Sequence, residues 1–150
     1  MKEKTMPRIF QTPAAAPAVA ARHFAARLAL ETDASDLHEA LEAGAKNLVV
    51  IDGRSPEAFK RRHIQGAINL WHREIDAKST AAFDKHSLYV SYCTGVGCNA
   101  SAKAALKLAR LGFKVKELSG GLKWWKWEGY PTAKGKSKSK KKSRSQAKGE

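Results

Sequence analysis

Hydrophobic and polar positions follow two periods along this chain, one typical of strands and one typical of helices. A continuous apolar run at 48–51 fits a strand that is covered on both faces, and 88–92 and 114–118 also have strand patterns. Helical patterns cover 100–111 and 121–128. Because strands and helices alternate, the sequence predicts an α/β fold with a central, mostly parallel sheet flanked by helices.

Shorter elements fill the gaps between these segments. Residues 22–31 predict an N-terminal helix, and Ser35 is a suitable N-cap for a second helix that Gly44 would end. Residues 55–57 place a proline in the first turn of a short helix, and 67–70 have a short strand pattern. In a parallel sheet of this kind, the reactive site is expected at the carboxyl ends of the strands.

Cys93 stands at such a strand end. It directly follows the strand at 88–92 and opens a glycine-containing loop, after which the helix at 100–111 begins. Backbone N–H groups and the positive end of the helix dipole meet there, and both favour the reactive thiolate. We therefore predict that Cys93 is the catalytic nucleophile, with a buried structural cysteine as the alternative. The loop amides would bind the anionic sulfur, so the predicted substrate-binding residues are Thr94, Gly95, Val96, Gly97, Cys98 and Asn99.

Five motifs follow one another over about residues 36–132: Asp52-Gly53-Arg54, the segment from His63 to Asn69, Tyr92-Cys93, the segment from Ser101 to Ala105, and the segment from Leu118 to Trp125 that closes with Gly129-Tyr130-Pro131. In type and order, these motifs resemble those of the rhodanese domain. The resemblance implies a three-layer rhodanese-like fold and a single-domain sulfurtransferase. Cys93 would take sulfane sulfur from a thiosulfate-like or persulfide donor, become a persulfide, and pass the sulfur to a thiol or cyanide. We expect neither a cofactor nor a metal.

The loop departs from the usual pattern of this family, which resembles Cys-x-x-Gly-x-Arg. Cys98 stands where that arginine would be, and Asn99 follows it. The phosphatase and arsenate-reductase branches of the fold depend on an arginine six positions after the cysteine, so Asn99 disfavours phosphoryl chemistry. Arg73, after the strand at 67–70, is a candidate substitute cation, with a plain surface position as the alternative. Cys98 could instead act as a resolving thiol, if the loop brings it to disulfide distance.

Two further motif positions are interpreted as structural. Asp52 and Arg54 follow a strand end, and we interpret them as an ion pair or hydrogen-bond clamp. His63 is expected to fix the turn before Gly66 rather than to transfer protons.

The charge of the chain is unevenly distributed. Of the formal net charge of +14, residues 134–150 carry +7, and 134–144 offer no apolar side chain with which to fold. We predict a disordered basic tail at 133–150, a rhodanese-like domain at 17–132 with the helix at 22–31 as an extension, and a disordered segment at 1–16. The tail could make weak contact with a polyanion or simply aid solubility.

Composition limits the remaining possibilities. The sequence has no apolar run of about 18 residues, so no membrane span is expected. Its two cysteines lie in a reactive-loop context, which favours a cytoplasmic location. The expected partners are a small-molecule sulfur donor and a thiol acceptor, and the oligomeric state is left open. A non-catalytic binding or regulatory module, and a thiol redox protein that uses Cys93 and Cys98, remain alternative functions.

Overall fold

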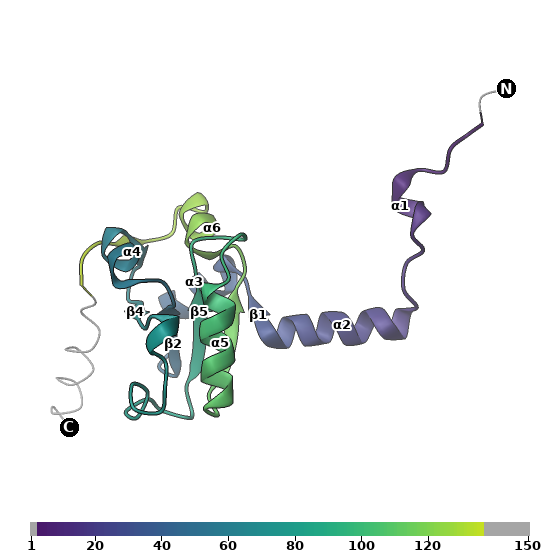
Figure 1. Cartoon of the computed structure of the whole chain (residues 1–150). Helices are drawn as coiled ribbons and strands as arrows, with labels where there is room; N and C mark the ends of the chain where they lie inside the picture. The colour runs from purple at the N-terminus through teal and green to yellow at the C-terminus, as the bar shows by residue number, and fades with distance from the viewer. Residues whose placement is uncertain (1–2, 137–150) are drawn as a thin grey trace.

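A computed structural model of the chain, which describes residues 3–136, has a five-stranded sheet at its centre (Figure 1). The strand order is β1-β6-β5-β2-β4, and every neighbouring pair is parallel. The strands are β1 (Glu31–Thr32), β2 (Leu48–Asp52), β4 (Ile68–Asn69), β5 (Leu88–Tyr92) and β6 (Lys114–Leu118). The predicted α/β fold with a central parallel sheet is confirmed.

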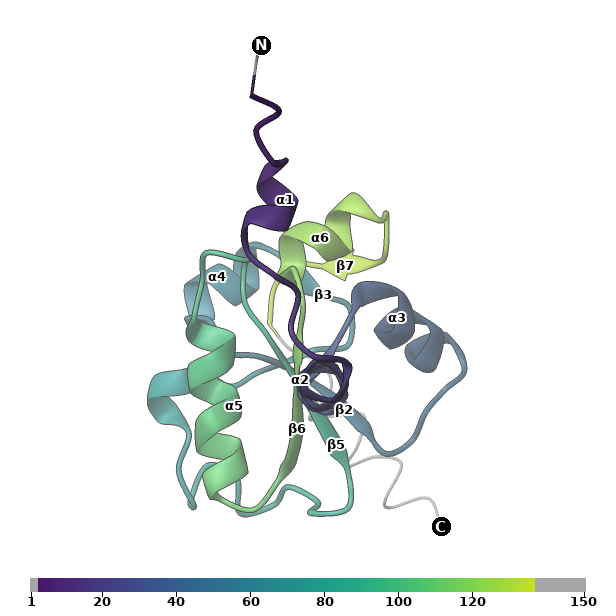
Figure 2. The ribbon, with the colours of Figure 1, turned by 90° about the vertical axis from the view of Figure 1, so that its right-hand side faces the viewer.

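Helices cover both faces of the sheet and extend the chain beyond it. Figure 2 shows α5 on one side of the sheet and α3 on the other. The remaining strands, β3 (His63–Ile64) and β7 (Thr132–Ala133), form a separate antiparallel pair. The helices are α1 (Arg8–Gln11), α2 (Pro17–Leu30), α3 (Ala34–Glu42), α4 (Pro56–Arg61), the 3-10 helix η1 (His72–Glu74), α5 (Ala100–Arg110) and α6 (Gly121–Trp127).

The hydrophobic core has two halves, one on each face of the sheet. Val50 and Val90 point to the half that includes Trp125, while Ile51 and Tyr89 point to the half beneath α5. Neighbouring residues of a strand face opposite sides, so β2 and β5 need apolar side chains at consecutive positions. This requirement explains the continuous apolar runs in the sequence.

Two helix starts differ from the sequence predictions. The predicted helix at 22–31 is too short, because α2 begins at Pro17, where proline suits the first turn, and residue 31 belongs to β1. The next helix is capped by Asp33 rather than by Ser35. The Asp36 N–H donates to Asp33 Oδ1 at 2.8 Å, and Ser35 lies inside the first turn. An ionised carboxylate at the N-cap also benefits from the helix dipole.

Helix α2 projects away from the domain (Figure 1). Within residues 17–30, all of which the structure describes, no side chain is buried, and Phe24 and Leu28 are largely exposed. Across residues 3–136, no helix is both long and apolar enough to cross a membrane.

The predicted terminal segments are described only in part. Within 1–16, the structure has the short helix α1, and Ala133 pairs with His63 in β7. The predicted basic tail lies outside the described residues from 137 onward. The predictions of disorder and the domain boundaries therefore stay predictions.

Candidate functional site

The cysteine loop starts at the carboxyl edge of the sheet. Strands β2 and β5 end together at the pair Asp52 and Tyr92, and Cys93 follows directly. The Gly53 N–H donates to the Tyr92 carbonyl at 3.2 Å. A Cβ on Gly53 would lie 3.0 Å from the Ala100 carbonyl oxygen, so the turn after β2 packs closely against the start of α5. Cys93, directly after β5, is 1% exposed.

Helix α6 holds the loop through backbone hydrogen bonds. The Leu122 N–H donates to the Cys93 carbonyl at 2.9 Å, and the Lys123 N–H donates to the Thr94 carbonyl at 2.8 Å. These bonds satisfy N–H groups in the first turn of α6 that have no partner within the helix. Because the C=O and N–H of a trans peptide point in opposite directions, the amides of Thr94 and Gly95 face away from α6.

Gly121 makes this close approach possible. Its φ is +59°, and a Cβ at this position would lie 2.4 Å from the Cys93 carbonyl oxygen and 3.0 Å from the Gly95 nitrogen. Any side chain would therefore push α6 and the loop apart. The sequence marks this glycine only as part of a motif, because its contact lies 28 positions earlier in the chain.

We expect Gly121→Ala to destabilise the domain more than Gly129→Ala does. Both glycines have positive φ, but a Cβ on Gly129 would have nothing within 4 Å. The control should show only the left-handed backbone cost of about 1–2 kcal/mol, whereas Gly121→Ala adds the clash with Cys93. Urea denaturation measures both effects. Equal losses of unfolding free energy would contradict the proposed role of Gly121.

The loop brings its two cysteines together. Cys93 and Cys98 form a disulfide with a Cα–Cα distance of 6.1 Å, within the usual range for such bonds. The geometric condition for Cys98 as a resolving thiol is therefore met. The two residues differ in exposure: Cys93 is buried, and Cys98 is partly exposed.

A largely apolar cavity of about 630 Å³ opens beside the loop. Two parallel tryptophan rings, Trp124 and Trp127, form part of its wall with centroids 6.2 Å apart, and Lys123 adds a cation. The loop contributes five of the predicted binding residues to the lining: Thr94, Gly95, Val96, Gly97 and Cys98. The size is typical of a small-molecule site.

The other two predicted binding residues lie outside this lining. Asn99 is the N-cap residue of α5, and its side chain makes no capping hydrogen bond in the described part of the chain. Arg73 lies in η1, with its guanidinium 5.1 Å from the centroid of the Trp71 ring. Among the described residues, the cation that lines the tryptophan cavity is Lys123. The substrate-binding roles of Asn99 and Arg73 stay predictions.

The sequence pattern missed the contribution of α6. Of the three tryptophans of this helix, Trp125 is buried in the hydrophobic core at 1% exposure. Trp124 and Trp127 instead lie three positions apart on one helix face and are 49% and 79% exposed. That spacing was the available signal, but it does not reveal which loop the exposed face meets.

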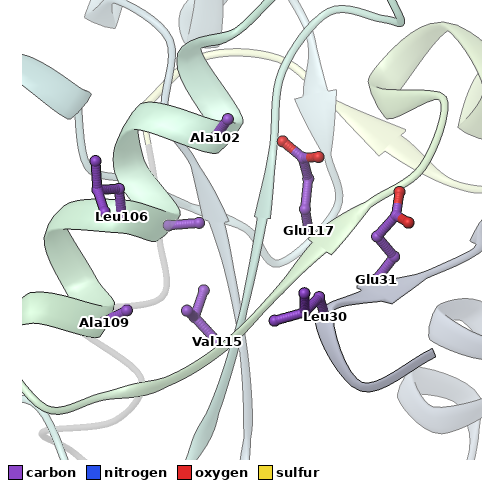
Figure 3. Close-up of a pocket in the computed structure, with 8 residues that line it drawn as sticks. Leu30, Glu31, Ala102, Leu106, Ala109, Val115 and Glu117 are labelled. Atoms are coloured by element: carbon purple, nitrogen blue, oxygen red, sulfur yellow. The ribbon is translucent and has the colours of Figure 1, made fainter. Parts of the chain in front are cut away.

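Carboxylates border a second side of the loop. Glu31 and Glu117 line a cavity of about 260 Å³ together with Cys98 and Arg27, and Arg27 Nε lies 3.0 Å from Glu31. The same two carboxylates border a separate apolar cavity of about 400 Å³ between α5, β6 and the end of α2 (Figure 3). That apolar cavity contains no cysteine, so we do not assign it to sulfur chemistry.

A buried ion pair supports the strand ends beneath the loop. Arg54 Nη2 lies 2.7 Å from Asp52 Oδ2 and donates to the Arg62 carbonyl at 2.6 Å. Burial alone would lower the pKa of Arg54, but the hydrogen bond and charge of Asp52 outweigh it and the pKa is raised. Burial, with the charge of Asp52, also raises the pKa of Tyr92, whose hydroxyl accepts the Ile64 N–H at 3.0 Å. The predicted structural ion pair is confirmed.

His63 also makes structural contacts. Its buried ring stacks on Phe59 at 3.7 Å between centroids, and Nδ1 is 2.8 Å from the Phe59 carbonyl oxygen. These contacts join the end of α4 to β3.

Comparisons with known proteins agree with this geometry. The family model of the rhodanese-like domain matches residues 33–128. The chain is 36% identical over 74 residues to the thiosulfate sulfurtransferase PspE of Escherichia coli (strain K12), covering 49% of this chain and 69% of PspE. The crystal structure of the BH2092 protein from Bacillus halodurans is similar with a TM-score of 0.77 and 38% identity, covering 79% of this chain and 87% of that one. A thiosulfate sulfurtransferase from Pseudomonas aeruginosa is similar with a TM-score of 0.62 and 27% identity, covering 73% of this chain and 20% of that chain.

The chain therefore belongs to the rhodanese-like domain family. This membership confirms the resemblance found in the sequence motifs. Together with the relative from Escherichia coli, it supports an assignment to the sulfurtransferases.

Proposed function

We propose that this protein is a sulfurtransferase that carries sulfane sulfur as a persulfide on Cys93. The observation that carries the proposal is the position of Cys93 at the end of β5, inside a backbone-held loop of a rhodanese-like domain. The thiosulfate sulfurtransferase relative indicates the class of donor.

The proposed reaction has two steps. The Cys93 thiolate attacks the outer sulfur of thiosulfate, the sulfur–sulfur bond of thiosulfate breaks, and sulfite leaves with the bonding electrons. An acceptor thiolate or cyanide then attacks the outer sulfur of the persulfide, and the Cys93 thiolate leaves. Only the reduced protein can begin this cycle, because the disulfide occupies the sulfur of Cys93.

Several parts of the site suit these steps. The amides of Thr94 and Gly95 face away from α6 and are available to an anionic sulfur on the other side of the loop. Lys123 can replace part of the charge of the missing loop arginine, and the tryptophan cavity can hold the body of an organic donor or acceptor. Such a cavity favours an organic persulfide over a small, strongly hydrated anion.

Sulfite release tests the first step directly. Pre-reduced protein is mixed with excess thiosulfate, and sulfite is measured in quenched samples. We expect one equivalent of sulfite per chain in the absence of an acceptor, because each Cys93 accepts one sulfur. If thiosulfate yields no sulfite and an organic persulfide also leaves Cys93 unmodified, the proposal is wrong.

The disulfide favours one other function, that of a thiol redox protein that uses Cys93 and Cys98. Such a protein would reduce a partner disulfide, or oxidise a partner dithiol, catalytically and without any sulfane sulfur donor. A disulfide-reduction assay in the absence of thiosulfate distinguishes it from a sulfurtransferase.

A further inference from the structure

From the disulfide geometry we infer that Cys98 resolves the Cys93 persulfide within the same loop and releases its sulfur as sulfide. This inference rests on the proposed sulfurtransferase function, since it concerns the fate of the persulfide. It assigns to the site a product, hydrogen sulfide, and a need for a dithiol reductant.

The loop holds Cys98 where it can react with Cys93. The sulfurs of the two residues are bonded in the structure, and their Cα atoms are 6.1 Å apart. Both ends of the loop are fixed by backbone contacts: α6 holds the Cys93 and Thr94 carbonyls, and the Cys98 N–H donates to the Gly95 carbonyl at 3.1 Å. A thiol held in this way reacts as if at very high concentration. It therefore competes effectively with acceptors in solution.

The step balances without an external oxidant. The Cys98 thiolate attacks Sγ of the Cys93 persulfide, and a bond forms between the two Sγ atoms. The outer sulfur of the persulfide takes up the proton that Cys98 loses, directly or through water. Its bond to Cys93 Sγ then breaks, and it leaves as HS⁻ with the bonding electrons. The sulfane sulfur is reduced to sulfide while the two cysteines are oxidised to the disulfide.

The different exposure of the two cysteines determines which sulfur of the disulfide an external reductant attacks. In the disulfide, Cys93 is buried, whereas Cys98 lines both cavities beside the loop. A thiolate of an external dithiol therefore reaches the Cys98 sulfur, and the Cys93 thiolate leaves. The second thiol of the reductant then displaces Cys98, which restores both cysteines and leaves the reductant as a disulfide.

Single-turnover experiments with thiosulfate test the inference. Wild-type protein is reduced, freed of reductant and mixed with thiosulfate, and sulfite, sulfide and protein mass are followed together. We expect sulfite and sulfide in equal amounts, with the protein ending as the disulfide. Cys98→Ser, whatever its rate of sulfite release, should release no sulfide above background, and should retain one extra sulfur on Cys93 for each sulfite released. The reciprocal variant Cys93→Ser, which keeps Cys98, should release neither.

Three results would overturn the inference. Wild-type protein that releases sulfite but keeps its persulfide and forms no disulfide would exclude resolution by Cys98, while the proposed function would stand. Sulfur found on Cys98 would show attack at the outer sulfur instead. No sulfite from any of the proteins would exclude both the inference and the proposed function with thiosulfate. If Cys98→Ser does not fold, Cys98→Ala replaces it, and the products of wild-type protein also show whether Cys98 resolves the persulfide.

Discussion

Replacing Cys93 with serine is expected to abolish sulfane sulfur transfer and to leave the reduced protein folded. The hydroxyl of serine nearly matches the thiol in shape, but at neutral pH it remains protonated and cannot form a persulfide. Transfer from thiosulfate to cyanide should fall to the uncatalysed rate. The unfolding free energy, compared with reduced wild-type protein, should change by no more than about 1 kcal/mol.

The comparison must be made under reducing conditions, because the variant also loses the disulfide with Cys98. Measured against oxidised wild type, the loss of the cross-link would add its own contribution to stability. Transfer activity that survives the substitution in the folded protein would show that another group accepts the sulfur.

The second large effect is expected from Arg54→Met. This change leaves the Asp52 carboxylate, which is 0% exposed, without its cationic partner. Removing one member of a buried ion pair costs about 3–5 kcal/mol, since the remaining charge stays buried and uncompensated. The lost bond to the Arg62 carbonyl adds to the effect. Urea denaturation should show this loss with little dependence on salt, because buried charges are poorly screened.

Arg61→Met is the matched control for this experiment. Arg61 lies in the same region, on α4, but its side chain is exposed, so its replacement should change stability by about 0.5 kcal/mol or less. The double variant Asp52→Asn with Arg54→Met should recover part of the loss by removing the orphaned charge. Equal effects of Arg54→Met and Arg61→Met would contradict a supporting role for the ion pair.

Much of the fold could be predicted from local patterns. The bounds of β5 and β6 match the predicted strands at 88–92 and 114–118, because each forms an unbroken pairing in the sheet interior. The N-cap of α3 could not be assigned from pattern alone. Asp33 and Ser35 are both suitable caps two positions apart, and tertiary packing of the buried residues Ala34 and Leu37 decides between them.

Only part of the candidate site could likewise be predicted from local sequence. The loop residues from Thr94 to Cys98 follow Cys93 in the sequence, so contiguity with the nucleophile was enough to find them. The wall formed by Lys123, Trp124 and Trp127 lies 30 or more positions later and reaches the loop only through the packing of α6. Disulfide geometry likewise depends on the path of the loop, which Gly121 controls from α6.

The contacts by which α6 holds the cysteine loop do not involve the loop side chains that could set substrate preference. The holding bonds run between main-chain atoms of Cys93, Thr94 and α6, so they do not depend on what the loop side chains are. Val96 is 94% exposed, and a Cβ on Gly97 would have nothing within 4 Å. Natural drift or a designed library could therefore vary these two positions freely and alter substrate preference, while the nucleophile keeps its place. Substitutions at these loop positions can therefore change substrate recognition without a loss of folding stability that other substitutions would have to offset.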